Sequence, residues 1–191
     1  MKKLLLVSLL CVATITATAC GSKATAEKGE NTSKAEVTTS EETTEAETEA
    51  VSETIPLGES AKIGEWTVTV NNMQILDTVP DTYGQFNPDE GNKYLLITLT
   101  ASNEGKKADT FLSTFPMEDD ISAKVLFGDG YEFSQTNLLG YTKSIVSSSV
   151  NPLSSKEGNI AFKIPDSVGS SEDPLTLVFT CGNETLNFSI R

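Results

Sequence analysis

Apolar residues alternate with polar ones in one segment after another from residue 55 onward, and this period of two constrains the fold most. The segment from Trp66 to Val70 (WTVTV) shows the pattern most clearly. Successive side chains of an extended strand point to opposite faces, so the alternation predicts strands with one buried face. No segment keeps a helical period over three turns. The chain is therefore expected to be all-β.

Other strands and turns follow from similar signals. The nearly continuous apolar run from Lys93 to Ala101 predicts a strand in the middle of a sheet. Met73 and Ile75 fall out of phase with the preceding strand, which predicts a bulge near Asn71-Asn72. Glycines that tolerate a positive φ predict tight hairpins around residues 128–130 and 182–183. Further strands are expected over residues 121–127, 131–133, 160–164, 175–179 and 186–190.

Together these segments predict one antiparallel β-sandwich of immunoglobulin-like type over residues 55–191, with about seven to nine strands. The only Trp and all Phe, Tyr and Pro residues lie in this part of the chain. Residues 21–54 contain no aromatic residue and carry nine glutamates against three lysines. Such a segment buries too little apolar area to offset the entropy lost on ordering. We therefore expect residues 20–54 to be a disordered acidic tether, either a spacer or a solubilising linker.

The first residues form an export signal. A short basic start precedes an apolar run over residues 4–12, which is too short for a membrane span of about 20 residues. Residues 17–21 (ATACG) resemble the bacterial lipobox. The resemblance implies that signal peptide 1–19 is removed by cleavage between Ala19 and Cys20, and that Cys20 carries a lipid. The alternative is an ordinary secretory peptide cleaved after Ala19.

The lipid on Cys20 implies a location on the extracellular face of a bacterial cell membrane, because acyl chains anchor a protein through burial of their methylene groups. The net charge of -13 excludes a nucleic-acid-binding surface, which needs clustered Lys and Arg. Three cysteines are present. Cys11 lies in the expected signal peptide and Cys20 carries the expected lipid, so Cys181 has no partner and no intrachain disulfide is expected.

Histidine is absent from the chain, which removes the commonest general base and the commonest transition-metal ligand. We therefore expect no enzyme, no cofactor and no His-based metal site. Acidic side chains could still offer oxygen ligands to Ca²⁺, although their spacing is not that of an EF-hand loop. Solvated loop charge is the simpler interpretation of these residues, which are Asp89, Glu90, Glu118, Asp119, Asp120 and Asp129.

Several motifs resemble a family of bacterial lipoprotein domains of unknown function. They are the segment 58–64 (GESAKIG) before Trp66, the segment 90–96 (EGNKYLL), the segment 101–105 (ASNEG) and the segment 128–131 (GDGY). The family has an immunoglobulin-like fold similar to that of the mycobacterial immunoprotective extracellular antigen. The resemblance covers residues 55–191 and implies the fold. Its motifs are strand and turn patterns, so it implies no catalytic residue.

Two long connections carry the candidate partner-binding residues. Tyr83 and Phe86 lie in the connection 78–88, and Tyr141 lies in the connection 134–150. Loops at the ends of a sandwich often carry recognition sites. The alternative is that these rings cover the core beneath the loops. The function predicted from the sequence is thus a membrane-anchored, non-enzymatic interaction module for an unknown envelope protein or polymer, with a small-ligand or calcium-binding lipoprotein as the alternative.

Overall fold

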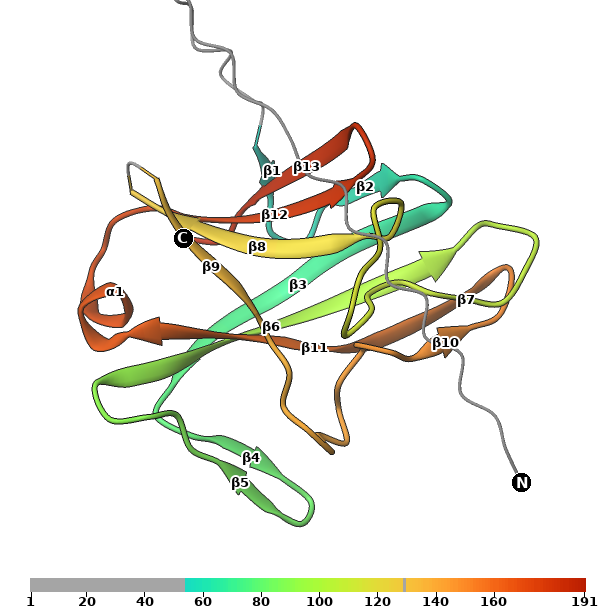
Figure 1. Ribbon diagram of the computed structural model, residues 1–191. Helices are drawn as coiled ribbons and strands as arrows, with labels where there is room; N and C mark the ends of the chain where they lie inside the picture. Colours follow the sequence, from blue (N-terminus) through green and yellow to red (C-terminus); the bar gives the residue numbers. More distant parts are fainter. Residues whose placement is uncertain (1–53, 129) are drawn as a thin grey trace, which may run out of the picture. The chain divides into compact units, whose positions relative to one another are not determined.

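The structure, a computed structural model, describes residues 54–128 and 130–191, which form a sandwich of two β-layers (Figure 1). The predicted signal peptide, Cys20 and the tether lie outside the described residues. The first layer contains, in spatial order, β1 (Ile55–Pro56), β13 (Glu184–Ser189), β12 (Leu175–Cys181), β8 (Ser122–Phe127) and β9 (Tyr131–Thr136). The second contains β11 (Ser154–Pro165), β6 (Asn92–Asn103), β3 (Trp66–Leu76) and β2 (Ser60–Ile63).

Strand β9 belongs to both layers, because it pairs first with β8 and then with β11. All pairings within the layers are antiparallel except that of β1 with β13. Two small strand pairs lie outside the layers: β4 (Val79–Asp81) with β5 (Gly84–Phe86), and β7 (Asp109–Thr110) with β10 (Ser149–Val150). The sandwich predicted from the alternating segments is confirmed, with nine strands in its layers.

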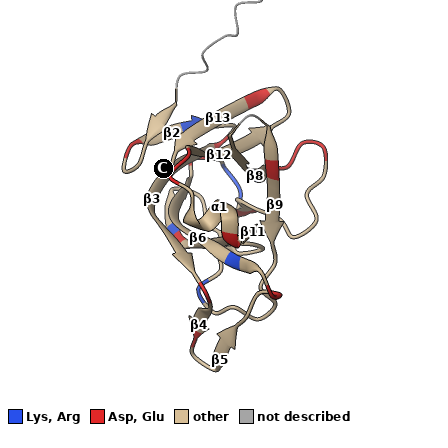
Figure 2. Ribbon diagram, turned by 90° about the vertical axis from the view of Figure 1, so that its left-hand side faces the viewer, with Lys and Arg blue, Asp and Glu red and all other residues tan. Residues whose placement is uncertain are grey.

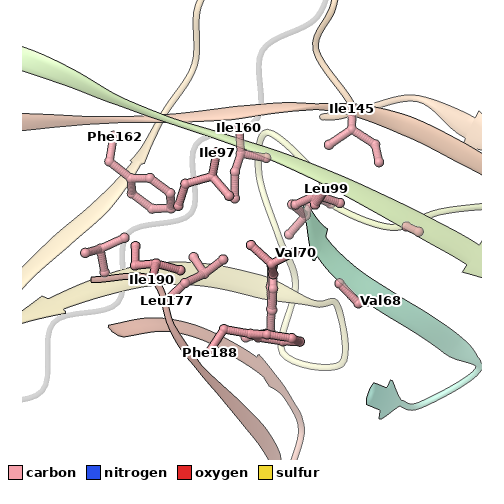
Figure 3. Packing of buried hydrophobic residues seen from close by; sticks show 14 of the residues in the cluster. Val68, Val70, Ile97, Leu99, Ile145, Ile160, Phe162, Leu177, Phe188 and Ile190 are labelled. Atoms are coloured by element: carbon pink, nitrogen blue, oxygen red, sulfur yellow. The ribbon is translucent and has the colours of Figure 1, made fainter. Parts of the chain in front are cut away.

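The core lies between the two layers. Val68 and Val70 of β3, Ile97 and Leu99 of β6, and Ile160 and Phe162 of β11 face Leu177, Phe188 and Ile190 from the opposite layer (Figure 3). In the core segments of these strands every second residue takes part, for example Leu95, Ile97 and Leu99 of β6, as the alternation requires. Trp66 joins this core with 5% of its surface exposed.

Strand β6 is buried on both faces, which explains its continuous apolar run. Leu95 and Ile97 face the main core, whereas Tyr94 and Leu96 belong to a second cluster with Ala161 of β11. The other members of this second cluster are Val79, Leu138 and Tyr141, with Leu76 and Phe86 packed against them. β4, β5 and the 137–142 loop therefore cover the outer face of β6 and β11.

The predicted turns and the predicted bulge are confirmed. The pairing of β3 with β6 shifts its register between Val70 and Asn72. Gly128 has a φ of 52° between β8 and β9, and Gly182 has a φ of 53° between β12 and β13. A side chain would strain the backbone at such angles.

One short helix, which the sequence pattern does not predict, closes an end of the sandwich. Helix α1 (Asp166–Ser170) follows β11 and lies across the opening between the layers when the molecule is viewed end-on (Figure 2). Its Val168 is buried and joins the core. With five residues, α1 is too short to show a helical period in the sequence.

Candidate functional site

The hairpin of β4 and β5 extends from the lower side of the sandwich in Figure 1. Asp81 pairs with Gly84, so Thr82 and Tyr83 form its two-residue loop. Gly84 has a φ of 151°, which glycine adopts without steric strain, so the chain can turn back tightly at this position. The Tyr83 side chain lies at this tip and is 91% exposed.

A turn over residues 138–141 presents a second apolar side chain. The backbone N–H of Tyr141 donates to the carbonyl of Leu138 at 3.0 Å. Gly140 has a φ of 80° at the third position of this turn, where a type II turn requires glycine or asparagine. Leu139 occupies the second position and is 86% exposed.

The two turns meet over a pair of aromatic rings. The Phe86 and Tyr141 rings pack edge to face, with centroids 5.8 Å apart and an interplanar angle of 84°. Tyr141 is buried, and its hydroxyl accepts a hydrogen bond from the Asn159 amide at 2.7 Å. This ring pair connects both turns to the second cluster and so limits their movement.

Asp81 and Thr142 also join the two turns. The Thr142 backbone N–H donates to both carboxylate oxygens of Asp81 at 3.3 Å, and the Thr142 hydroxyl donates to Oδ1. The hydroxyl hydrogen bond is the main reason that the pKa of Asp81 lies below its ordinary value. Asp81 is therefore an anion at neutral pH and accepts these hydrogen bonds in its charged form.

Tyr83 and Leu139 border the same surface hollow, which is otherwise lined by Asp81, Gly84, Gln85, Phe86 and Gly140. We call Tyr83 and Leu139 together the apolar tip. Two large exposed apolar side chains from separate turns, set on a packed base, form a surface suited to binding. The geometry offers contact area and hydrogen-bonding groups.

The structure separates the three candidate partner-binding residues. Tyr83 is exposed, Phe86 is partly buried and Tyr141 is buried. The positions of Phe86 and Tyr141 favour the alternative in which the rings cover the core, whereas the Tyr83 ring is exposed. Leu139 was not among the candidates. The sequence Leu138-Leu139-Gly140-Tyr141 does contain a signal for the exposure of Leu139. Gly140 indicates a turn, and Leu139 is the residue before it, at the second position of that turn.

Of the acidic residues considered for Ca²⁺, Asp129 lies outside the described residues. Among the residues that the structure describes, no three Asp, Glu or Cys side chains are grouped so that they could hold a metal ion. Asp89 instead pairs with Lys163 at 2.5 Å. Asp120 accepts a hydrogen bond from the Met117 backbone N–H at 2.9 Å. Asp89 and Asp120 therefore already have partners within the protein.

Cys181 is half-buried at the end of β12, and its thiol donates to the Asp119 carbonyl at 3.4 Å. Burial, and then the nearby charges of Glu184, Asp119 and Asp120, raise the pKa of the Cys181 thiol. The thiolate, which is the reactive form, is thus disfavoured. A structural thiol is the simplest description of this residue.

Comparisons with known proteins agree with the predicted family. A model of a domain of unknown function, DUF4352, matches residues 55–182. A search of curated proteins found no match. Neither the family's description nor those of the solved structures below names an enzymatic activity.

Three solved structures align with much of this chain. An uncharacterized β-sandwich protein from Clostridium difficile 630 is 21% identical and aligns with a TM-score of 0.55, over 73% of this chain and 95% of that one. A conserved hypothetical protein from Bacillus anthracis is 14% identical, with a TM-score of 0.50 over 71% and 94%. The secreted protein MPT63 from Mycobacterium tuberculosis is 16% identical, with a TM-score of 0.49 over 72% and 98%. The first of these supports the sandwich fold.

The described residues contain no helix that is both long enough and apolar enough to cross a membrane.

Proposed function

The chain belongs to the family of DUF4352, a domain of unknown function, and we propose that it is a surface lipoprotein whose β-sandwich binds an envelope protein or polymer without catalysis. A lipid on Cys20 holds the mature protein on the extracellular face of the cell membrane. Residues 20–54 link this lipid to the sandwich. The apolar tip is the part of the sandwich that meets the partner.

The observation that carries this proposal is the exposure of Tyr83 and Leu139 at 91% and 86% beside one hollow. Exposed apolar side chains that occur singly need no explanation, but neighbours on a fixed base mark an interaction surface. Tyrosine is also enriched among the residues that dominate binding energy, because its ring is large and its rotamers are few. The Phe86–Tyr141 ring pair and the Asp81–Thr142 hydrogen bonds hold the two turns in place before binding.

Replacing the apolar tip is expected to abolish partner capture. We would crosslink intact cells that produce the tagged full chain, or its Tyr83→Ser, Leu139→Ser variant, and compare the captured proteins and glycans. The wild type should capture a partner that the double variant loses, with a drop of at least about tenfold, since each lost contact of this kind costs about 1 kcal/mol or more.

The matched control replaces a different exposed tyrosine and a different exposed leucine by serine. Tyr131 and Leu153 are 68% and 89% exposed and lie outside the hollow of the apolar tip. The Tyr131→Ser, Leu153→Ser variant should capture the partner as the wild type does. Equal loss in both variants, or equal capture by all three proteins, would show that the apolar tip is not the binding surface.

Lipidation is tested by a cysteine exchange. The Cys20→Ala variant should move from the membrane pellet to the culture medium, because burial of acyl chains at about 0.8 kcal/mol per CH₂ no longer holds it. The control is Cys11→Ala, which changes a cysteine of the predicted signal peptide and should leave the protein in the pellet. The same distribution for wild type and Cys20→Ala would show that Cys20 is not the anchor.

A further inference from the structure

A second hollow lies where β9 leaves the first layer for the second. β8 pairs with β9 only as far as Lys124 and Ser134. The next residues of β9, Gln135 and Thr136, pair instead with β11. Figure 1 shows β9 crossing between the layers at this point. The first residues of β8 are thus paired with β12 on one side only. On the other side β8 and β9 diverge, and we call the hollow between them the fork.

The side chains that line this fork mostly carry hydroxyl or amide groups and are nearly uncharged, although apolar atoms make up more of the lining surface than polar atoms do. The lining residues supply five hydroxyl groups, two amides and no carboxylate, in a chain with 27 acidic residues. The single cation, Lys124, pairs with Glu132 at 2.5 Å. The lining residues are Ser113, Thr114, Pro116, Ser122, Ala123, Lys124, Ser134, Gln135, Asn137 and Thr180.

Most of these polar groups are uncommitted. Thr114 bonds to the Ser147 hydroxyl at 2.9 Å, and Ser113 accepts from the Phe115 N–H at 3.2 Å. In the part of the chain that the structure describes, none of the other hydroxyl and amide side chains of the fork makes a hydrogen bond, namely those of Ser122, Ser134, Gln135, Asn137 and Thr180. Hydroxyls and amides both donate and accept, so this wall can match a ligand that does the same.

Apolar groups also contribute to the lining of the fork. Pro116 and Ala123 line it beside the hydroxyls and amides. A surface that combines apolar contact area with hydrogen-bonding groups suits a ligand with one apolar face and many hydroxyls.

Charge and polarity narrow the ligand class. An anion would find only Lys124, which is already paired with Glu132, and a cation would find no carboxylate. An apolar ligand would bury hydroxyls and amides without partners, which costs about 1–3 kcal/mol for each group. A neutral saccharide offers hydroxyls to the serines and threonines, and an acetamido group matches the amides of Gln135 and Asn137.

From this geometry we infer that the fork between β8 and β9 binds an uncharged oligosaccharide of N-acetylated hexosamines. The inference does not depend on the function proposed above, because the fork and the hollow of the apolar tip share no lining residue. Either binding surface can therefore fail a test while the other passes.

Calorimetric titration of the purified full chain with N,N′,N″,N‴-tetraacetylchitotetraose tests this site. Wild type should bind with a dissociation constant of about 1 mM or tighter. The Gln135→Ala, Asn137→Ala variant should bind at least about tenfold more weakly, since it loses both amides.

The control is the Asn72→Ala, Gln74→Ala variant, which removes two exposed amides of β3 that line neither hollow. It should bind the sugar as the wild type does. No heat at about 10 mM sugar would overturn the inference, as would equal affinities of wild type and the Gln135, Asn137 variant. Preferential binding of an uncharged extended peptide such as acetyl-tetrathreonine amide would also overturn it, because that result would assign the fork to strand addition along β8.

Discussion

The Asn103→Ala variant is expected to lose about 3 kcal/mol or more of its free energy of unfolding, because each buried polar group left without a partner costs about 1–3 kcal/mol. Asn103 is 1% exposed and ends β6. Its amide donates to the carbonyls of Lys107 and Val150 at 2.8 and 2.9 Å, and its Oδ1 accepts from the Gly105 N–H at 2.8 Å.

These three hydrogen bonds connect the end of β6 to three neighbouring segments. The turn after β6, the residues before β7 and the end of β10 all depend on the one side chain. Alanine leaves the buried Val150 carbonyl and Gly105 N–H, and the partly buried Lys107 carbonyl, without their amide partner. The loss should therefore exceed that of an ordinary surface asparagine.

Urea unfolding followed by circular dichroism measures this difference, with Asn87→Ala as the matched control. Asn87 is exposed and its side chain bonds only to Gln85, so its replacement should change the free energy of unfolding by no more than about 0.5 kcal/mol. A loss below about 1 kcal/mol for Asn103→Ala would mean that water replaces the amide at this position.

The sequence predicts the layers of this fold well, because burial of one face imposes a strict period of two. The strands around Trp66, Phe162 and Phe188 were identified in this way, and the bulge after Val70 followed from the change of parity. The continuous run of β6 predicted a central strand correctly. Its physical cause, a second cluster on the outer face, became clear only from the position of the β4–β5 hairpin.

Short elements were missed for a related reason. β4 and β5 have three residues each, and β7 and β10 have two, so none is long enough to show a period. The segment 78–88 was consequently expected to be a connection without strands. Its Val79 packs into the second cluster, and this tertiary contact accounts for a hairpin that the local pattern does not predict.

The candidate site was only partly accessible to sequence reasoning. Local composition indicated that two loops carried aromatic residues, and the structure does bring Tyr83 and the 138–141 turn together. Which ring is buried depends on contacts such as that of Tyr141 with Asn159, which lies 18 residues away in sequence. The fork between β8 and β9 depends on a change of strand partner at Gln135, and the local sequence carries no signal for that change.

The aromatic core predicts the other large effect. Four buried rings form a chain of edge-to-face contacts: Trp66 with Phe111 at 5.4 Å, Phe111 with Phe179 at 5.4 Å, and Phe179 with Phe188 at 6.0 Å. Phe179 has two of these contacts and no exposed surface. Because β3, β12 and β13 all contribute rings, the chain of contacts joins the two layers.

The Phe179→Ala variant should lose about 3–5 kcal/mol of its free energy of unfolding, because the lost burial of the ring adds to the cost of the cavity left behind. Urea unfolding should show a lower midpoint with an unchanged slope. Phe115→Ala is the control, since Phe115 is 85% exposed and its loss should change the free energy of unfolding by about 0.5 kcal/mol at most. Losses of similar size in both variants would mean that the ring chain does not stabilise the contact between the layers.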